Sequence, residues 1–494
     1  MNHPIKMRPK SISFQNSTKN MNKSLNAFFT IFLLFFTIPG LGQKEYQVKF
    51  RINGLKDTAC IIANYYGSNT YIKDTVKVDG MGRCIFKGSD KLPKGMYLFV
   101  ISDKLYFDFI INNDHKFSME TDLSAITDHV VIKNSPENVL FYQYIRYSRE
   151  QYEQIRQYED LVKKYGSQSD SSKILKSKID RVNKDVAAYK LDVIKNNPDS
   201  FLTLLFQIMR EPEIPQSEMG KNKREDSSFT YYYYKSHFWD NLDLKDDRIL
   251  RTPIFHKKLT QYFDKVLFPH PDSIIMVVDT LIEKVRSNPE MFKYFIWFST
   301  YHYENSEIMG FDKIFVHLVD KYYATGEVTW LNKTVLENMI KKSNKIKPVL
   351  IGKTAPNIIM QDTSLNLVSM QNIKSRYLLL LFWDPECQHC KQEIPKIKEI
   401  YQNDKEKYGL EIMAICSDSS LVKMKKTIRD KQMNWINVNG PRTLTGDFHE
   451  QYDVIQTPVL YLLNEKKEII AKKFAVDQLE RILINYDQQV SGSK

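Results

Sequence analysis

The first part of the chain alternates apolar and polar residues with the period of a β-strand. Between residues 44 and 53, Tyr46, Val48, Phe50 and Ile52 are separated by polar residues, which predicts a half-buried strand. Similar patterns predict strands at residues 96–101 and 105–111. Residues 76–78 and 84–86 flank an Asp-Gly pair and predict a hairpin. We therefore expect a small antiparallel β domain over residues 44–132.

The middle of the chain has helical patterns. Ser135 followed by Pro136 is a helix start, and this helix is predicted to run to Tyr165 with Gly166 as its stop. A second helix is expected at residues 171–196. Residues 211–228 lack apolar periodicity and are expected to form a loop, after which helices resume from 229 to about 346. This predicts an all-α domain over residues 133–348. Its two aromatic clusters, within residues 231–239 and 301–303, are interpreted as ordinary core packing rather than as a substrate groove.

In the last part of the chain, strand and helix patterns alternate. An apolar run at residues 378–383 predicts a buried strand and is followed by a helical pattern. Further strands are expected at 411–416, 459–463 and 469–474, and helices at 421–433, 444–452 and 477–486. Alternation that ends in a β-hairpin predicts an α/β domain over residues 349–494. The fold class is thus multidomain, with β, helical and α/β parts in chain order.

The corner between that buried strand and its helix carries two cysteines. Cys387 and Cys390 lie three residues apart in the first helical turn, so their sulfurs share one face and can form a disulfide. The first sulfur lies beside unpaired backbone N–H groups, which favours the thiolate. Cys387 is therefore the expected attacking thiol and Cys390 the resolving thiol, and the ring of His389 could stabilise the thiolate further.

These residues resemble the active site of TlpA-like thioredoxin-fold thiol-disulfide oxidoreductases of the bacterial envelope. Phe382 and Trp383 end the strand, Cys387 and Cys390 form the Cys-x-x-Cys motif, and Pro395 lies downstream in the helix. The order of export signal, β, helical and C-terminal domains also resembles the multidomain members of this group.

The resemblance implies further site residues. Pro458 stands where such proteins carry a cis proline that faces the dithiol, and the backbone of Thr457 would then be presented to an extended substrate peptide. Leu381 stands where thioredoxins carry a buried carboxylate that handles protons, so this aid to Cys390 is absent or comes from elsewhere.

The cysteines allow other interpretations. A zinc half-site is disfavoured because structural zinc normally needs four ligands and the chain has no second Cys-x-x-Cys. We expect no metal and no cofactor.

Cys60 and Cys84 could pair with each other, although two buried free thiols are slightly favoured. Cys416 lies in a predicted buried strand and is expected to be inert.

The N-terminal segment is typical of an export signal. Residues 27–38 are an apolar run of secretory length, preceded by Lys23 and followed by Pro39 and Gly40. We interpret residues 1–42 as a signal peptide, with Met21 as an alternative start, and expect no transmembrane span after cleavage. A retained signal anchor is the alternative. Export predicts location in the periplasm or cell envelope.

The length and net charge of the chain bear on the number of domains and on nucleic-acid binding. A chain of 494 residues is expected to hold about two to four domains. The net charge of +12 includes five positive residues in the first 42, and the remainder is dispersed, which argues against a nucleic-acid partner.

The predicted function is an exported thiol-disulfide oxidoreductase that acts on protein thiols and disulfides and is served by a membrane-linked or soluble redox partner. The rival prediction is a client- or ligand-binding protein in which residues 44–346 do the main work. The sequence leaves open whether the dithiol oxidises, reduces or isomerises.

Overall fold

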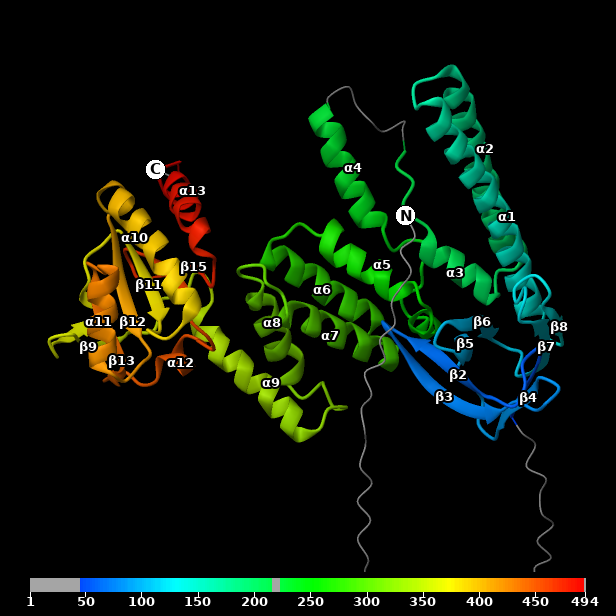
Figure 1. The fold of residues 1–494 in the computed structure, drawn as a ribbon, viewed down its shortest axis with the longest axis horizontal. Coiled ribbons are helices and arrows are strands. Elements are labelled where there is room, and N and C mark those ends of the chain that lie inside the picture. Colours follow the sequence, from blue (N-terminus) through cyan, green and yellow to red (C-terminus); the bar gives the residue numbers. More distant parts are fainter. Residues whose placement is uncertain (1–44, 216–222, 493–494) are drawn as a thin grey trace, which may run out of the picture. The chain divides into compact units, whose positions relative to one another are not determined.

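The computed structural model describes residues 45–215 and 223–492 (Figure 1). The predicted signal peptide over residues 1–42 lies outside these residues. The helices that are described include none long and apolar enough to cross a membrane.

The β region consists of two four-stranded sheets. Buried residues alternate with more exposed ones along β1 (Tyr46–Asn53), and the predicted strands at 96–101 and 105–111 are confirmed. The buried face carries an aromatic cluster in which Phe50 packs 4.3 Å from Phe99 between ring centroids. In sheet order, the strands are β4 (Arg83–Gly88), β1, β7 (Lys116–Asp122) and β8 (Val131–Lys133), and then β3 (Asn69–Lys77), β2 (Ala59–Tyr66), β5 (Gly95–Ser102) and β6 (Leu105–Ile111).

The predicted hairpin in the β region needs correction. β3 and β4 do not form the expected hairpin, because β3 pairs with β2 and β4 pairs with β1 in the other sheet. The turn at Asp79 is present, but the strands diverge beyond it, so that Cys84 and Phe86 of β4 lie opposite β1 in the core. In addition, β1 and β7 are parallel, whereas the other pairs in these two sheets are antiparallel.

The helical region begins as predicted. Ser135 accepts a hydrogen bond from the Asn138 backbone N–H at 3.3 Å and caps α1, which ends before Gly166. The larger helices are α1 (Pro136–Tyr165), α2 (Asp170–Asn196), α3 (Phe201–Met209), α4 (Lys223–His237), α5 (Phe255–Gln261), α6 (Pro271–Val285), α7 (Pro289–Glu304), α8 (Asp312–Leu318) and α9 (Lys333–Ile346). Shorter helical turns are η2 (Asp247–Arg251), η3 (Tyr262–Val266), η4 (Val319–Tyr323) and η5 (Lys347–Val349).

The loop predicted over residues 211–228 is too long, since α4 already begins at Lys223. Lys, Arg and Glu at its start favour helix by intrinsic propensity and need no apolar periodicity, so the pattern did not reveal them.

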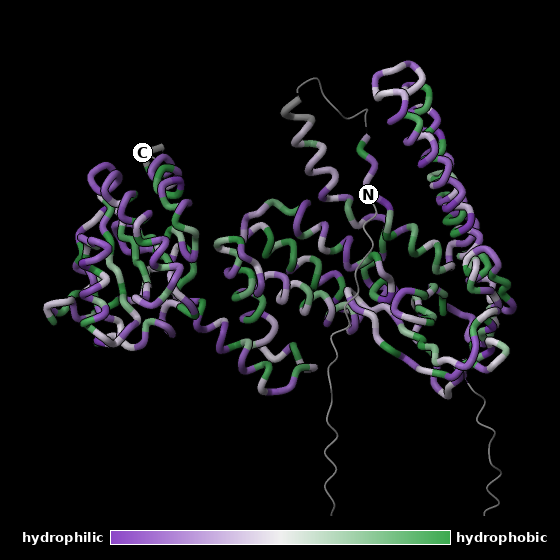
Figure 2. The backbone as a smooth tube through the Cα atoms, in the orientation of Figure 1, coloured by the Kyte–Doolittle hydropathy of each residue, from purple (hydrophilic) through white to green (hydrophobic). Residues whose placement is uncertain are grey.

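The β sheets and the helices share one hydrophobic core, which runs from Tyr46 to Leu350. Most residues of α3 are buried in it, whereas few residues of α1 and α2 are. Figure 2 shows this difference as a mostly hydrophobic α3 beside a largely hydrophilic α1 and α2.

The C-terminal domain is built on a seven-stranded sheet with β11 near its centre. β11 is parallel to β12 and antiparallel to β14. In sheet order the strands are β10 (Leu367–Ser369), β9 (Ile359–Asp362), β13 (Ile436–Thr443), β12 (Leu410–Cys416), β11 (Tyr377–Trp383), β14 (Val459–Asn464) and β15 (Ile469–Lys472). The helices are α10 (Gln388–Tyr408), α11 (Leu421–Lys431), α12 (Phe448–Gln451) and α13 (Leu479–Gly492), with short turns η6 (Met370–Asn372) and η7 (Val476–Gln478).

β11 is buried on both faces, which explains its unbroken apolar sequence. Leu379, Leu381 and Trp383 belong to a core that includes residues of α10, α11 and α13. The alternate residues Leu378, Leu380 and Phe382 belong to a second core, which includes Phe448 of α12. The sheet thus has helices on both faces, as the α/β prediction requires.

The prediction for residues 444–452 is wrong at its start. The Leu444 backbone N–H donates to the Ile359 carbonyl at 2.8 Å and so continues the contact of β13 with β9, and Gly446 turns the chain at a φ of 93°. Only α12 is helical there. Strands β9, β10 and β13 were not predicted, because they are short or mixed in polarity.

Candidate active site

Polar contacts hold the loop between β11 and α10. The Asp384 carbonyl accepts from the Cys387 backbone N–H at 3.2 Å, and its carboxylate accepts from the Glu386 N–H at 2.8 Å. The Ser417 hydroxyl, just beyond β12, donates to the same carboxylate at 2.6 Å. These contacts hold Cys387 at the start of α10.

Cys387 caps α10 with its sulfur, which accepts a hydrogen bond from the Cys390 backbone N–H at 3.1 Å. Partial burial raises the pKa of the Cys387 thiol. Hydrogen bonds from the Cys390 and Thr457 side chains and from the backbone N–H groups of Cys390 and His389 outweigh that effect, so the pKa is below its usual value. Cys387 is partly exposed. It therefore combines access with thiolate character.

Cys390 has the opposite environment. It is fully buried, and burial raises the pKa of its thiol to about 12, with a further contribution from the hydrogen bond to Cys387. The pair thus consists of one accessible thiol that ionises readily and one buried thiol that holds its proton.

The loop before β14 approaches the same sulfur. The Thr457–Pro458 peptide bond is cis, as predicted, and the Cys387 thiol donates to the Thr457 carbonyl at 3.2 Å. The structure therefore brings Cys387 and Cys390, at the corner between β11 and α10, together with Thr457 from the loop before β14.

Residues 351–480 match the AhpC/TSA family. The C-terminal domain, which has a seven-stranded sheet with helices on both faces, is therefore a thioredoxin-fold domain of this family. The chain is therefore a thioredoxin-fold redox enzyme of multidomain form. Residues 46–141 and 164–345 match two domain families of unknown function, DUF4369 and DUF5106.

Similar proteins carry corresponding names. The thiol-disulfide oxidoreductase ResA of Bacillus cereus is 26% identical over 155 residues, which are 30% of this chain and 84% of the relative. A domain of a possible thiol-disulfide isomerase from Cytophaga hutchinsonii is 34% identical, covering 29% of this chain and 97% of that one, with a TM-score of 0.27. A thioredoxin-like protein from Bacteroides caccae is 20% identical, covering 56% of this chain and 97% of that one, with a TM-score of 0.43.

The supporting residues of the enzyme lie in different settings. Trp383 is fully buried in the core that also contains Cys390. His389 is exposed, and its backbone N–H is among the groups that lower the pKa of Cys387. Asp384 and Ser417 were missed as positioning residues, although the Asp-Pro-Glu sequence is a turn signal.

Leu381 was expected at the position where thioredoxins carry a buried carboxylate. Its side chain is fully buried and belongs to the core that includes residues of α10. The groups that influence the Cys390 thiol are Cys387, Asp384 through its backbone, and Thr457. A carboxylate side chain is not among these groups.

The remaining cysteines of the enzyme are buried free thiols. Burial raises the pKa of Cys60 to about 11 and those of Cys84 and Cys416 to about 12. No disulfide joins Cys60 and Cys84 in this structure, and the preference for two free thiols stays a prediction. Over residues 45–215 and 223–492, we find no group of three His, Cys, Asp or Glu side chains placed to hold a metal ion.

Proposed function

We propose that this enzyme is exported and exchanges dithiols and disulfides with protein substrates of the cell envelope, through a mixed disulfide at Cys387. The observation that carries the proposal is the asymmetry of the pair. Cys387 has a partly exposed thiol with a lowered pKa, and its sulfur accepts a hydrogen bond from the backbone N–H of Cys390. The Cys390 thiol is buried and has a pKa of about 12.

In the reducing direction, the Cys387 thiolate attacks one sulfur of a substrate disulfide. The Cys387–substrate bond forms, the substrate S–S bond breaks, and the second substrate sulfur leaves as a thiolate. Cys390 then loses its proton to that departing thiolate and attacks Cys387. The Cys387–Cys390 disulfide forms, the Cys387–substrate bond breaks, and the remaining substrate sulfur leaves as a thiolate that takes a proton from water, so two electrons have passed to the substrate. The oxidising direction is the reverse.

The order of the two steps follows from the contacts of Cys390. Its hydrogen bond to Cys387 and the charge of the Cys387 thiolate both raise the Cys390 pKa. A mixed disulfide removes that charge, so the Cys390 pKa falls when Cys390 is needed as a nucleophile. This fall in the Cys390 pKa partly replaces the proton-handling carboxylate that thioredoxins carry at the position of Leu381.

Thr457 supports the docking of an extended peptide. Its carbonyl lies 3.2 Å from the Cys387 sulfur and can accept a backbone N–H from a substrate strand when the thiol is ionised. Pro458 follows directly and has no N–H of its own to donate.

Export is supported by the apolar run at residues 27–38 with Lys23 before it. In the periplasm or envelope, a membrane-linked or soluble dithiol protein would return Cys387 and Cys390 to the working redox state. The direction of flow depends on the reduction potential of the pair, where 30 mV is worth about 1.4 kcal/mol. Equilibration with glutathione buffers measures that potential.

Trapping tests the mechanism. The Cys390→Ser variant should accumulate mixed disulfides at Cys387, detected as shifted bands on non-reducing gels and identified by mass spectrometry. The Cys387→Ser variant should not, because its remaining thiol is buried. Cys416→Ser is the matched control and should trap nothing. Equal trapping by the Cys387→Ser and Cys390→Ser variants would refute the assigned roles.

A further inference from the structure

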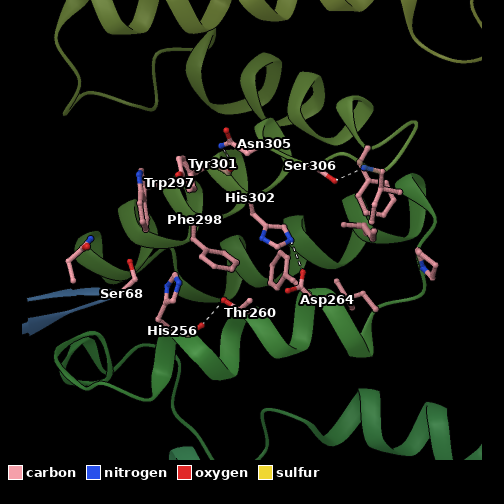
Figure 3. A pocket seen from close by; sticks show the side chains of 17 residues that line it. Ser68, His256, Thr260, Asp264, Trp297, Phe298, Tyr301, His302, Asn305 and Ser306 are labelled. Carbon is pink, nitrogen blue, oxygen red and sulfur yellow. Dashed lines mark hydrogen bonds and ion pairs between the residues drawn. The ribbon is translucent and has the colours of Figure 1, made fainter. Parts of the chain in front are cut away.

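A cavity of about 740 Å³ lies outside the redox site, among α5, η3, α7 and the turn between β2 and β3 (Figure 3). Ser68 comes from that turn, His256 from α5, Asp264 from η3 and Tyr301 from α7. A volume of this size is in the range of small-molecule sites, which typically combine an apolar lining with a few convergent polar groups.

One wall of the cavity is aromatic. Trp297 and Tyr301 are one helical turn apart on α7, their rings lie 5.8 Å apart at 13°, and they are 40% and 57% exposed. Phe298 and His302 form a parallel pair beside them, at 5.5 Å and 20°. Large aromatic rings left half exposed at the opening of a cavity suit contact with a ligand that has an apolar face.

Polar side chains line the same cavity, among them His302 and Asp264. His302 Nε2 lies 3.1 Å from a carboxylate oxygen of Asp264. Burial lowers the pKa of His302, although the Asp264 charge opposes this effect. The neutral ring therefore donates through Nε2 and keeps Nδ1 as an acceptor.

Further hydrogen-bonding groups line the cavity. Asn305 donates its side-chain amide to the Tyr301 carbonyl at 2.7 Å, which leaves its amide oxygen as an acceptor. Ser306 accepts from the Ile308 backbone N–H at 3.2 Å, and its own O–H can still donate. The cavity thus offers both donors and acceptors.

The backbone that carries Asp264 is unusual. In η3 the Leu267 N–H donates to the Tyr262 carbonyl at 3.1 Å, which closes a π-helical turn. Such turns are rare and frequently occur at functional sites. Phe263 and Asp264, both in this turn, line the cavity.

We propose that this cavity binds a neutral saccharide unit. A pyranose ring has a face of C–H groups that suits Trp297 and Tyr301, and it has hydroxyls that both donate and accept, as Asp264, His302 and Asn305 require. The residues described around the cavity include Asp264 but neither lysine nor arginine, which disfavours an anionic ligand. A purely apolar ligand would leave the polar groups unpaired.

Calorimetry on the full chain tests the proposal. The probes are the methyl glycosides of glucose, galactose, mannose and N-acetylglucosamine at millimolar concentration, with glucuronate as the anionic comparison and a blocked alanine–tyrosine peptide as the peptide comparison. We expect saturable binding of at least one neutral glycoside and weaker or no binding of both comparison probes.

Variants locate the binding. Trp297→Ala and Tyr301→Ala should each weaken it by about tenfold or more. Trp297→Phe should preserve binding but remove the ligand-induced change in tryptophan fluorescence. Tyr152→Ala, at a 53% exposed tyrosine on α1, is the matched control and should bind like the unaltered protein. Unchanged melting temperatures separate these effects from misfolding.

Three results would overturn the proposal: no binding of any neutral glycoside, binding that survives both Trp297→Ala and Tyr301→Ala, or binding of the peptide in preference to all glycosides. The disulfide-exchange activity depends on other residues and should be the same in all these variants, so the two proposals can fail separately.

Discussion

The enzyme contains two cysteine pairs in contrasting environments. Cys387 and Cys390 lie at the strand-to-helix corner of the thioredoxin-like domain, whereas Cys60 and Cys84 lie in the core of the β region. The pKa of Cys387 is lowered, while burial raises the pKa of Cys60 to about 11 and that of Cys84 to about 12.

The difference comes from the backbone around each sulfur. Cys84 pairs with Phe50 and Cys60 with Val76 inside sheets, where backbone N–H groups serve the strand ladders. The first turn of a helix leaves N–H groups without carbonyl partners, and at α10 they point at Cys387. Reactivity therefore depends on where the fold leaves donors unused, not on the cysteine itself.

The largest expected effect is the loss of activity in Cys387→Ser. Serine is far less acidic than a thiol and cannot form the mixed disulfide, so turnover of a disulfide substrate should fall by at least about a thousandfold. Insulin reduction with dithiothreitol measures it. Cys60→Ala is the matched control from the other pair and should keep its activity. If Cys387→Ser retained activity, the site would be elsewhere.

For stability, the larger effect is expected in the β region, at Cys84. Cys84→Ser places a hydroxyl in an apolar core and should lower the free energy of unfolding by about 1–3 kcal/mol. Urea denaturation measures the change, and Cys84→Ala separates the hydroxyl from the lost volume. An unfolding midpoint unchanged in Cys84→Ser would contradict the burial of this residue.

A smaller effect is expected for His389→Ala. Because His389 acts on the Cys387 thiolate through its backbone N–H, removing the exposed ring should change the Cys387 pKa by less than about one unit. The pH dependence of thiolate absorbance measures this shift. A rise of more than about one unit would restore the role of the ring that the sequence suggested.

The sequence predicted the features that depend on local patterns. The Cys387–Cys390 corner, the capped start of α1 at Ser135 and the cis bond before Pro458 follow from neighbouring residues or from resemblance. The pairing of β4 with β1 does not, because alternation shows which face of a strand is buried but not which strand lies beside it.

Contacts between segments far apart in the chain could not be predicted from the sequence either. The Ser417 hydroxyl reaches Asp384 across 33 positions of the chain, and Thr457 reaches Cys387 across 70. The cavity likewise combines the turn at Ser68 with residues of α5 and α7 that lie far later in the chain, such as His256 and Tyr301. Such groups are assembled by the fold, and their individual residues carry no local signal.

The most direct test of the central claim is pH-dependent alkylation of the reduced full chain, with each cysteine followed by mass spectrometry. Because the Cys387 pKa is lowered, its rate should stay high as the pH falls below the ordinary thiol value of about 8.5, and decline only through its own lower pKa. Cys60, Cys84 and Cys416 should remain unmodified over the same range. Equal rates at Cys387 and Cys84, or a Cys387 midpoint at or above the ordinary thiol value, would contradict the account.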